Sequence, residues 1–175
     1  MKTIFITIFQ GVEAKNILRT DIYKKLISHD DVRIVFFVGT REKAKYFEKE
    51  FSGSNVIYEV VMPDKPAGFN GFFSVLSFKL LNTDTVDLRR KMDLETGGGY
   101  VKYYCDFILN KILAMPWIRK ASRVLDYKFS KSPSFSAYFD KYNPSVVFLA
   151  HLFDDMEIKL LKEAKRRGVK TVGFI

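Results

Sequence analysis

Apolar residues occur along this chain in two alternating patterns. Unbroken runs of β-branched and aromatic residues are typical of strands buried on both faces of a parallel sheet, and they predict strands at 3–9, 32–38 and 55–61. Between these runs, apolar residues recur every three or four positions among charged ones, which predicts amphipathic helices over 13–29 and 41–51. The front of the chain therefore predicts a β-α-β-α-β unit.

The end of the chain repeats this pattern, with a strand predicted at 145–150, a helix over 154–167 and a strand at 170–175. Crossovers between parallel strands are right-handed, so these elements predict a doubly wound parallel sheet with helices on both faces. The predicted fold class is therefore α/β and Rossmann-like, and we expect one such domain over 1–175.

The segment between the third strand and the strand that begins at Ser145 has no strand pattern. Its apolar spacing instead predicts a long helical insert over 63–133. The helices of the insert are predicted at 72–81, 84–95, 100–114 and 118–129. Inserts of this length usually are functional or form a partner surface, so this one is a candidate for either role.

Composition and charge limit the classes of protein to which this chain can belong. The chain is 47% hydrophobic and 28% charged, which is typical of a globular domain, and its net charge of +9 favours anionic partners. Cys105, His29 and His151 are its only cysteine and histidines, so neither an internal disulfide nor a structural zinc site is expected. This cysteine usage is typical of a cytosolic, metal-free chain. No apolar run is long enough to cross a bilayer.

Several common ligands are excluded by missing motifs. Gly11 lacks the two further glycines of a dinucleotide fingerprint, and Gly97–Gly99 has neither a preceding strand nor a following Lys-Ser/Thr, which excludes a Walker loop. The three glycines are therefore predicted to be a joint between helices, and we expect no cofactor. No helix-turn-helix, RRM signature or zinc finger is present, so nucleic acid is not an expected partner.

Ligands of open α/β sheets bind beyond the carboxyl ends of the strands. In the first strand-to-helix loop we expect Gln10, Gly11, Lys15 and Asn16 to bind substrate, since backbone N–H groups at a helix amino terminus favour an anionic group. His151 follows the Ser145 strand at the same edge and suits a general base or a phosphate contact, with Asp154 beside it. The alternative is that His151 only caps the strand end and Asp154 only caps the next helix.

Three stretches carry a resemblance to a known family. They are FQGVEAKNILRTDIYKKL, DVRIVFFVG and HLFDDMEIKLLKEAKRRGVKTVGFI. Together they resemble the amino-terminal half of bacterial GT-B glycosyltransferase-like proteins. The most similar are UDP-glycosyltransferase/glycogen phosphorylase-like chains, and distant kin are UDP-N-acetylglucosamine 2-epimerases and CDP-glycerol glycerophosphotransferases. The resemblance implies two Rossmann-like domains, of which the first selects the acceptor and the second holds a nucleotide-activated sugar.

The resemblance also gives Glu13 a role. In several GT-B enzymes that invert configuration, an acid or histidine in this loop deprotonates the acceptor hydroxyl, and Glu13 is the loop's only carboxylate. The alternative is that Glu13 only complements the helix dipole. The sequence ends inside a predicted strand and lacks the second domain that the resemblance implies. We therefore expect these residues to be the front part of a longer protein and to be inactive alone.

The insert is strongly basic. Over 87–131 there are ten Lys or Arg residues and five acids, interleaved with aromatic and aliphatic residues. This pattern fits an anionic membrane surface or a lipid-linked acceptor, with contacts expected from Arg119, Lys120, Arg123 and Trp117. The alternative is a helix hairpin that packs on the sheet and has a solvated basic face.

Taken together, these features predict the acceptor-binding domain of a glycosyltransferase-like protein in surface-glycan or cell-envelope assembly. Its acceptor would be a glycan or a lipid-linked molecule, and the nucleotide-sugar would bind the second domain. The predicted location is cytoplasmic, with peripheral attachment to the inner face of the membrane. The alternative is a non-catalytic Rossmann-like binding module whose basic insert holds a membrane or a protein partner.

Overall fold

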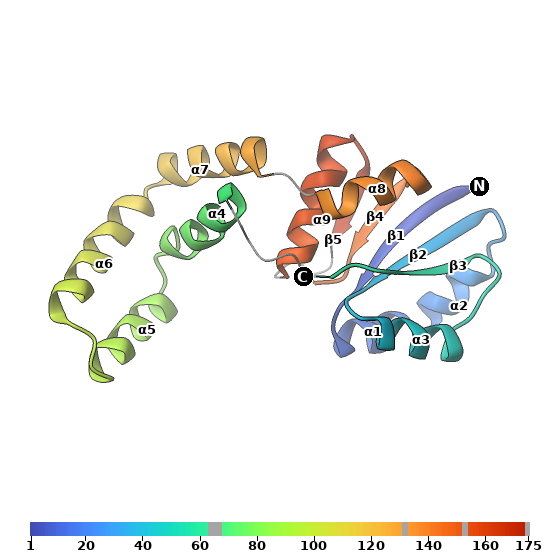
Figure 1. Cartoon of the computed structure of the whole chain (residues 1–175), viewed down its shortest axis with the longest axis horizontal. Helices are drawn as coiled ribbons and strands as arrows, with labels where there is room; N and C mark the ends of the chain where they lie inside the picture. Colours follow the sequence, from blue (N-terminus) through green and yellow to red (C-terminus); the bar gives the residue numbers. More distant parts are fainter. Residues whose placement is uncertain (63–67, 131–132, 152–153, 174–175) are drawn as a thin grey trace. The chain divides into compact units, whose positions relative to one another are not determined.

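The chain forms two compact units. The computed structural model describes residues 1–62, 68–130, 133–151 and 154–173. One unit comprises Met1–Asp64 together with Ser132–Ile175, and the other comprises Lys65–Lys131 (Figure 1). The predicted insert is therefore a unit of its own, and each unit is described here separately.

The first unit, which we call the sheet unit, contains a five-stranded parallel sheet in the order β3-β2-β1-β4-β5. The strands are β1 Lys2–Ile8, β2 Val32–Val38, β3 Val56–Val60, β4 Val146–Leu149 and β5 Lys170–Gly173. In the central strand, Ile6 pairs with Phe36 on one side and Phe148 on the other. The predicted α/β, Rossmann-like class is confirmed, and the strand order reverses between β1 and β4.

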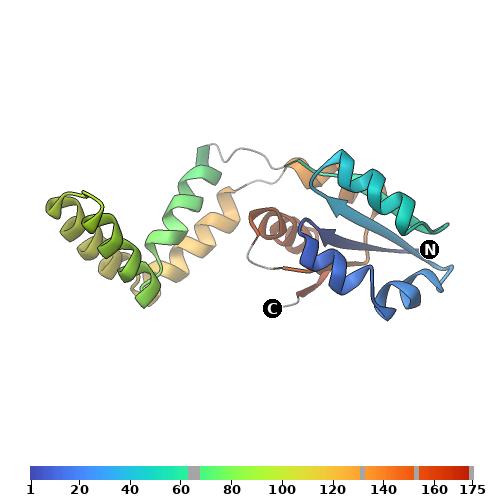
Figure 2. The same ribbon diagram turned by 90° about the horizontal axis from the view of Figure 1, so that it is seen from below.

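Helices cover both faces of this sheet. The helices of the sheet unit are α1 Gly11–Ile17, α2 Asp21–Ile27, α3 Arg41–Glu50, α8 Pro133–Tyr142 and α9 Asp155–Arg166. Helices α1, α2 and α3 lie on one face of the sheet (Figure 2), and their side chains join one apolar cluster with Ile6, Ile8 and Phe36. Side chains of α8 and α9 join the other cluster with Phe5 and Phe37. Successive strand residues point to opposite faces, so each unbroken apolar run supplies both clusters.

The helix predicted over 13–29 is two helices, and that prediction is wrong in this respect. The Thr20 hydroxyl donates to the carbonyls of Asn16, at 2.9 Å, and Ile17, at 3.1 Å, at the end of α1. Thr20 then has the extended backbone of an N-cap, and α2 begins at Asp21. A threonine that satisfies the last carbonyls of one helix competes with the continuation of that helix.

Helix α8 was not predicted at all, although its sequence carries the signal. Phe135, Phe139 and Tyr142 follow one another at spacings of four and three residues and are all buried in the cluster with Phe5. Rings of Phe139 and Tyr142 meet the Phe5 ring edge-on, with centroids 5.2 and 6.2 Å apart. The spacing is that of an amphipathic helix face.

The second unit, which we call the helical unit, contains the four helices predicted for the insert. They are α4 Gly68–Lys79, α5 Asp84–Glu95, α6 Tyr100–Leu113 and α7 Pro116–Phe129. Both apolar clusters of buried residues lie in the sheet unit. Among the described side chains of the helical unit, the buried ones are polar: Asn110, Ser122 and Ser130. Apolar burial therefore is not what fixes the packing of these helices.

A polar network holds α4, α5 and α6 together. The Asn110 amide of α6 donates to the carbonyls of Lys79, at 2.8 Å, and Leu81, at 2.6 Å, at the end of α4. Arg90 of α5 donates to the Asp106 carbonyl at 3.1 Å, and the Lys79 ammonium contacts the Asp106 carboxylate at 2.6 Å. Each bond links separate segments of the unit, so Asn110 and Asp106 lie on the inward side of α6, next to the partly buried Phe107.

We expect Asn110→Leu to destabilise the helical unit by about 1–3 kcal/mol, because it removes the buried Asn110 amide that donates to the Lys79 and Leu81 carbonyls. Hydrogen exchange measured residue by residue should show faster exchange across α4 to α6 and unchanged exchange in β1 and β2. Asn82→Leu, at an exposed position between α4 and α5, is the matched control and should leave both regions unchanged. Equal protection of α6 in both variants would contradict the role assigned to Asn110.

Candidate functional site

The strongest candidate site lies where the strand order reverses, beyond the carboxyl ends of β1 and β4. A cavity of about 300 Å³ opens there in the sheet unit. It is lined by the polar residues Gln10, Glu13, Asn16 and His151 and by the apolar residues Val12, Ile17, Ile22, Phe148 and Ala150. This is the crevice in which doubly wound sheets bind their ligands. The break between α1 and α2 contributes to it, since Ile22 lies in the first turn of α2.

Glu13 is the central residue of this cavity. It lies in the first turn of α1 and is only 4% exposed. Its Oε2 accepts hydrogen bonds from the backbone N–H of Phe9, at 2.5 Å, and of Gln10, at 3.0 Å. Its Oε1 is buried and has no hydrogen-bond partner among the described residues. One oxygen thus caps the helix, while the other is buried without a partner in a residue that lines the cavity.

The surroundings of Glu13 favour its protonated form. Burial raises the pKa of the Glu13 carboxyl above its usual value, and the N–H bonds from Gln10 and Phe9 only partly offset this. The nearby Asp154 carboxylate raises this pKa further, while His151 lowers it. A carboxyl group tuned upward in this way is suited to exchange a proton with a bound ligand near neutral pH.

A second buried carboxylate, Glu157, was missed by the sequence analysis. It is fully buried, and its Oε1 accepts from the Thr7 hydroxyl at 2.6 Å while its Oε2 accepts from the His151 N–H at 2.8 Å. Burial raises the pKa of Glu157, the bonds from Thr7 and His151 oppose this, and the charge of Glu13 raises it again. The two carboxyls therefore interact electrostatically.

The sequence did contain a signal for Glu157. It precedes Leu160 and Leu161 by three and four residues and Ala164 by seven, so it falls on the apolar face predicted for that helix. Thr7 is likewise a polar residue inside an apolar strand, and its oxygen also accepts from the Ala150 N–H at 3.1 Å. A charged residue on a buried face needs a buried partner, and Thr7 is that partner.

The structure brings together some of the predicted residues. Glu13, His151, Gln10 and Asn16 line one cavity, as expected from their positions at the same sheet edge. Of the other predicted substrate-binding residues, Gly11, Lys15 and Asp154 do not line it. Lys15 is exposed on α1.

Asp154 has the role that the alternative gave it. Its carboxylate accepts from the Met156 N–H at 2.8 Å and so caps α9. Its remaining influence on the cavity is the charge that it places near Glu13.

The expected preference for an anion in the first loop does not fit this geometry. The N–H groups of Phe9, Gln10 and His151 donate to the protein's own carboxylates, Glu13 and Glu157. A phosphate would have to displace those bonds and approach carboxylates in a desolvated setting, which is unfavourable. The cavity therefore suits an uncharged hydroxyl-bearing ligand better than an anionic one.

The four predicted surface residues of the helical unit do not share one face. Trp117 and Lys120 are exposed on α7. Arg119 and Arg123 instead line a cavity of about 260 Å³ next to α4, together with Ser122 and Asp126. Positions 119 and 123 thus lie on the side of α7 next to α4, although Arg123 is exposed, and contact of all four residues with one surface stays a prediction.

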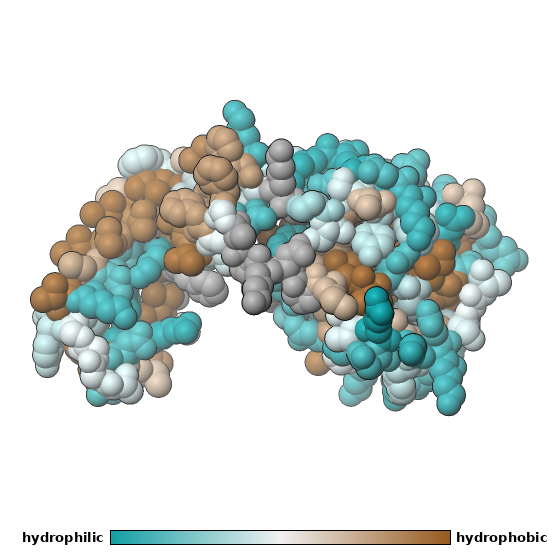
Figure 3. All heavy atoms as spheres, in the orientation of Figure 1, coloured by the Kyte–Doolittle hydropathy of each residue, from teal (hydrophilic) through white to brown (hydrophobic). Residues whose placement is uncertain are grey.

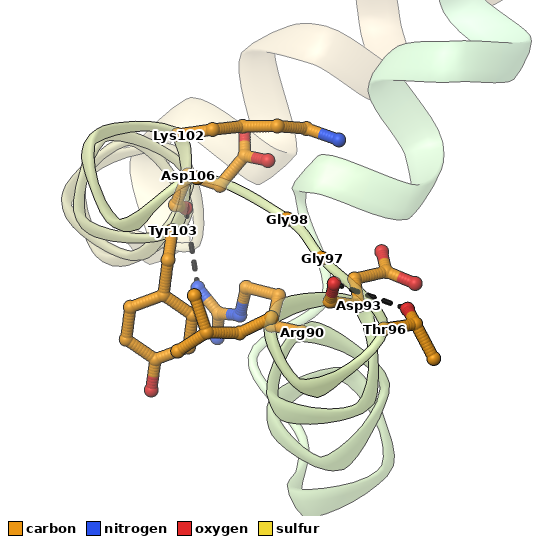
Figure 4. Close-up of a pocket in the computed structure, with 10 residues that line it drawn as sticks. Arg90, Asp93, Thr96, Gly97, Gly98, Lys102, Tyr103 and Asp106 are labelled. Atoms are coloured by element: carbon orange, nitrogen blue, oxygen red, sulfur yellow. Dashed lines mark hydrogen bonds between the residues drawn. The ribbon is translucent and has the colours of Figure 1, made fainter.

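A further cavity, of about 360 Å³, lies at the glycine turn between α5 and α6 (Figure 4). Gly97 has a φ of +104°, in the left-handed region, and a Cβ on Gly98 would lie 2.5 Å from the Asp93 carbonyl oxygen. Only glycine fits there without a shift, and the turn is a tight and specific one. Arg90, which lines the cavity, is bonded to Asp87 and to the Asp106 carbonyl, so it is part of the packing.

Comparison of the chain with protein-family models, with curated proteins and with solved structures finds no match in any of the three. Within the described ranges, no three His, Cys, Asp or Glu side chains are grouped so as to hold a metal ion. The case for a function therefore rests on the cavity at the switch between β1 and β4.

We expect Glu13→Gln to make the protein more stable than the parent at neutral pH and equally stable near pH 4. The raised pKa means that the folded state holds this proton more tightly than the unfolded state does. Parent stability therefore falls as the pH rises from the usual carboxyl value through the raised one. The glutamine keeps an oxygen for the Phe9 and Gln10 N–H groups and removes this loss.

Urea denaturation over this pH range measures the effect, and Glu48→Gln, at an exposed position on α3, is the matched control. The control should follow the parent at each pH. A Glu13→Gln variant that is less stable than the parent at neutral pH would show that the ionised carboxylate stabilises the fold.

Proposed function

We propose that the sheet unit is the acceptor-binding domain of a glycosyltransferase-like protein. In this proposal the cavity binds a neutral, hydroxyl-bearing acceptor, and Glu13 is the base that deprotonates its hydroxyl. The observation that carries the proposal is the buried Oε1 of Glu13, which has no hydrogen-bond partner among the described residues and belongs to a cavity at the strand-order switch. The amides of Gln10 and Asn16 are placed to bind further hydroxyl groups.

The proposed chemistry is a displacement at the anomeric carbon of a nucleotide-activated sugar. The acceptor oxygen forms a bond to that carbon, the bond from the carbon to the nucleotide's phosphate oxygen breaks, and the acceptor proton passes to Glu13. Because burial raises the pKa of Glu13, its carboxylate is a stronger base than an exposed one. His151 lines the same cavity and lowers this pKa, which keeps a larger fraction of Glu13 ionised.

The remaining walls favour a sugar or polyol. Ile22, Phe148 and Val12 supply apolar surface, which packs against the C–H faces of a sugar ring. The charges of Glu13, Glu157 and Asp154 disfavour a phosphorylated acceptor at this edge. The acceptor class that fits is therefore uncharged at the end that enters the cavity.

One observation favours the alternative of a non-catalytic binding module. Glu13 Oε2 caps α1 through Phe9 and Gln10, which gives the carboxylate a structural reason to be present without catalysis. Such a module would bind the same neutral ligands but would not need Glu13 to ionise. A test of proton transfer therefore distinguishes the two functions, whereas a test of ligand binding does not.

Ligand binding to the cavity is tested by Asn16→Trp, which should fill it. In NMR titrations with methyl glycosides, amide signals of Asn16 and Ala150 should shift in the parent, and the affinity should fall at least tenfold in the variant. Lys15→Trp is the matched control, since Lys15 neighbours Asn16 on α1 and does not line the cavity. Sugar phosphates and UDP should bind more weakly than neutral glycosides, and the reverse order would contradict an uncharged acceptor.

Proton transfer is tested by Glu13→Gln in the natural gene product, supplied with nucleotide-sugars and glycan acceptors. The amide keeps the cap and the cavity but cannot accept a proton, so transfer should fall about 10²- to 10⁴-fold while glycoside binding changes little. Glycoside binding without transfer in the parent would favour the non-catalytic module. Transfer that survives in Glu13→Gln would exclude Glu13 as the base.

A further inference from the structure

Helix α6 exposes an apolar stripe. The stripe consists of Val101, Tyr104, Ile108 and Ile112, spaced by three or four residues, and Val101 is 80% exposed. Its inward side carries Asn110 and Asp106, which bond to α4 and α5, next to the partly buried Phe107. Surface helices of water-exposed proteins normally turn polar residues outward and apolar residues inward. The exposed apolar side of α6 is therefore better suited to contact an apolar surface than to face water.

Helix α7 continues this apolar surface. Trp117 is 68% exposed, and Val124, two turns later on the same side, is also exposed. Figure 3 shows the brown, hydrophobic side chains gathered over α6 and α7. We call the outward sides of these two helices the α6–α7 face. Exposed apolar surface on this scale marks an interaction site in a native protein.

The charges on these helices have one dominant sign. Between Tyr100 and Phe129 there are six basic residues and two acids, Asp106 and Asp126. Asp106 is paired with Lys79, and Asp126 lines the cavity next to α4, so neither acid belongs to the outward stripe. Three exposed lysines flank the apolar residues and form no ion pair within the part of the chain that the structure describes. They are Lys111, Lys120 and Lys128.

The arrangement of these lysines follows the apolar stripes. Lys120, Val124 and Lys128 are spaced by four residues along α7, and Lys111 follows Tyr104 by two turns along α6. An apolar face edged by lysines matches a bilayer surface, where apolar side chains enter the headgroup region and ammonium groups meet anionic lipids. Tryptophan and tyrosine favour the same interfacial depth.

We propose that the α6–α7 face docks on an anionic lipid bilayer, with both helices lying in the plane of the interface. Among the described residues, no helix has the length and apolar character needed to cross a bilayer. Each of the two helices has 14 residues, or about 21 Å, which is shorter than the ~30 Å hydrocarbon core. A second copy of this chain fits less well, because a symmetric pairing would bring like-charged lysines together.

The test uses the fluorescence of Trp117, the only tryptophan of the chain. Vesicles that contain phosphatidylglycerol and phosphatidylcholine should shift its emission to shorter wavelength, and brominated acyl chains in those vesicles should quench it. Vesicles of phosphatidylcholine alone should have little effect, and added salt should weaken the binding to anionic vesicles. Quenching by brominated lipid identifies the bilayer, since a protein partner or a second copy would not produce it.

Replacement of Lys111, Lys120 and Lys128 by glutamine should lower the partition coefficient about 5-fold for each lysine at low salt. The matched control replaces three exposed lysines of the sheet unit and has the same net charge. Its positions are Lys2, Lys25 and Lys45. Ile108→Ser with Ile112→Ser should also reduce binding while keeping the salt dependence, because it removes apolar contact only.

Three results would overturn the proposal. The first is a parent that does not bind anionic vesicles at low salt. The second is a lysine variant and a control that bind equally well. The third is a stable dimer in sedimentation that buries Trp117 without lipid. Asn16→Trp should co-sediment with anionic vesicles like the parent, so the outcome is independent of the function proposed for the cavity.

Discussion

The sheet unit depends on one buried carboxyl group, that of Glu157. Its two oxygens accept from Thr7, near the end of β1, and from His151, just beyond β4. The side chain itself belongs to the first turn of α9, so three elements meet at one group. An unpaired carboxylate in this position would be strongly destabilising, which restricts the elements to arrangements that keep both donors in place. The hydrogen bonds of Glu157 therefore hold β1, β4 and α9 in fixed positions beside the cavity.

The two buried carboxyl groups also set the chemistry of the neighbouring cavity. Burial raises the pKa of Glu13, and the Asp154 carboxylate raises it further, while the charge of Glu13 raises the pKa of Glu157. The N–H groups of Phe9, Gln10 and His151 are occupied by these two acids. These occupied donors are the reason that the proposed ligand is uncharged.

The sequence predicted the sheet well and the cavity only partly. Unbroken apolar runs such as 32–38 identify buried strands directly, and Thr40 and Gly168 mark the ends of helices by local chemistry. Glu157 was missed because a carboxylate in a first helical turn is usually explained by the helix dipole, and only the fold supplies Thr7 as its partner. The break at Thr20 also depends on a side-chain hydrogen bond that competes with ordinary helical spacing.

In the helical unit the sequence predicted the helices but not their faces. Apolar spacing locates α6, yet it cannot say that the stripe faces outward, because that depends on Asn110 and Arg90 bonding inward. Arg119 and Arg123 were predicted for the surface from the interleaved basic and apolar residues of the insert, and the fold places them on the side of α7 next to α4. The spacing of apolar residues shows that a helix has an apolar and a polar side. Which side faces the rest of the unit depends on the partners of its polar residues.

The position of the helical unit in the chain has an evolutionary consequence. It enters after β3, an edge strand of the sheet, and the chain returns before α8, so every strand pair and both apolar clusters lie outside it. Its sequence can therefore diverge, lengthen or be exchanged without disturbing a single strand register. Selection can therefore act on the helical unit and on the cavity as two nearly independent traits. Under the proposals made above, membrane attachment could change while the ligand of the cavity stays the same.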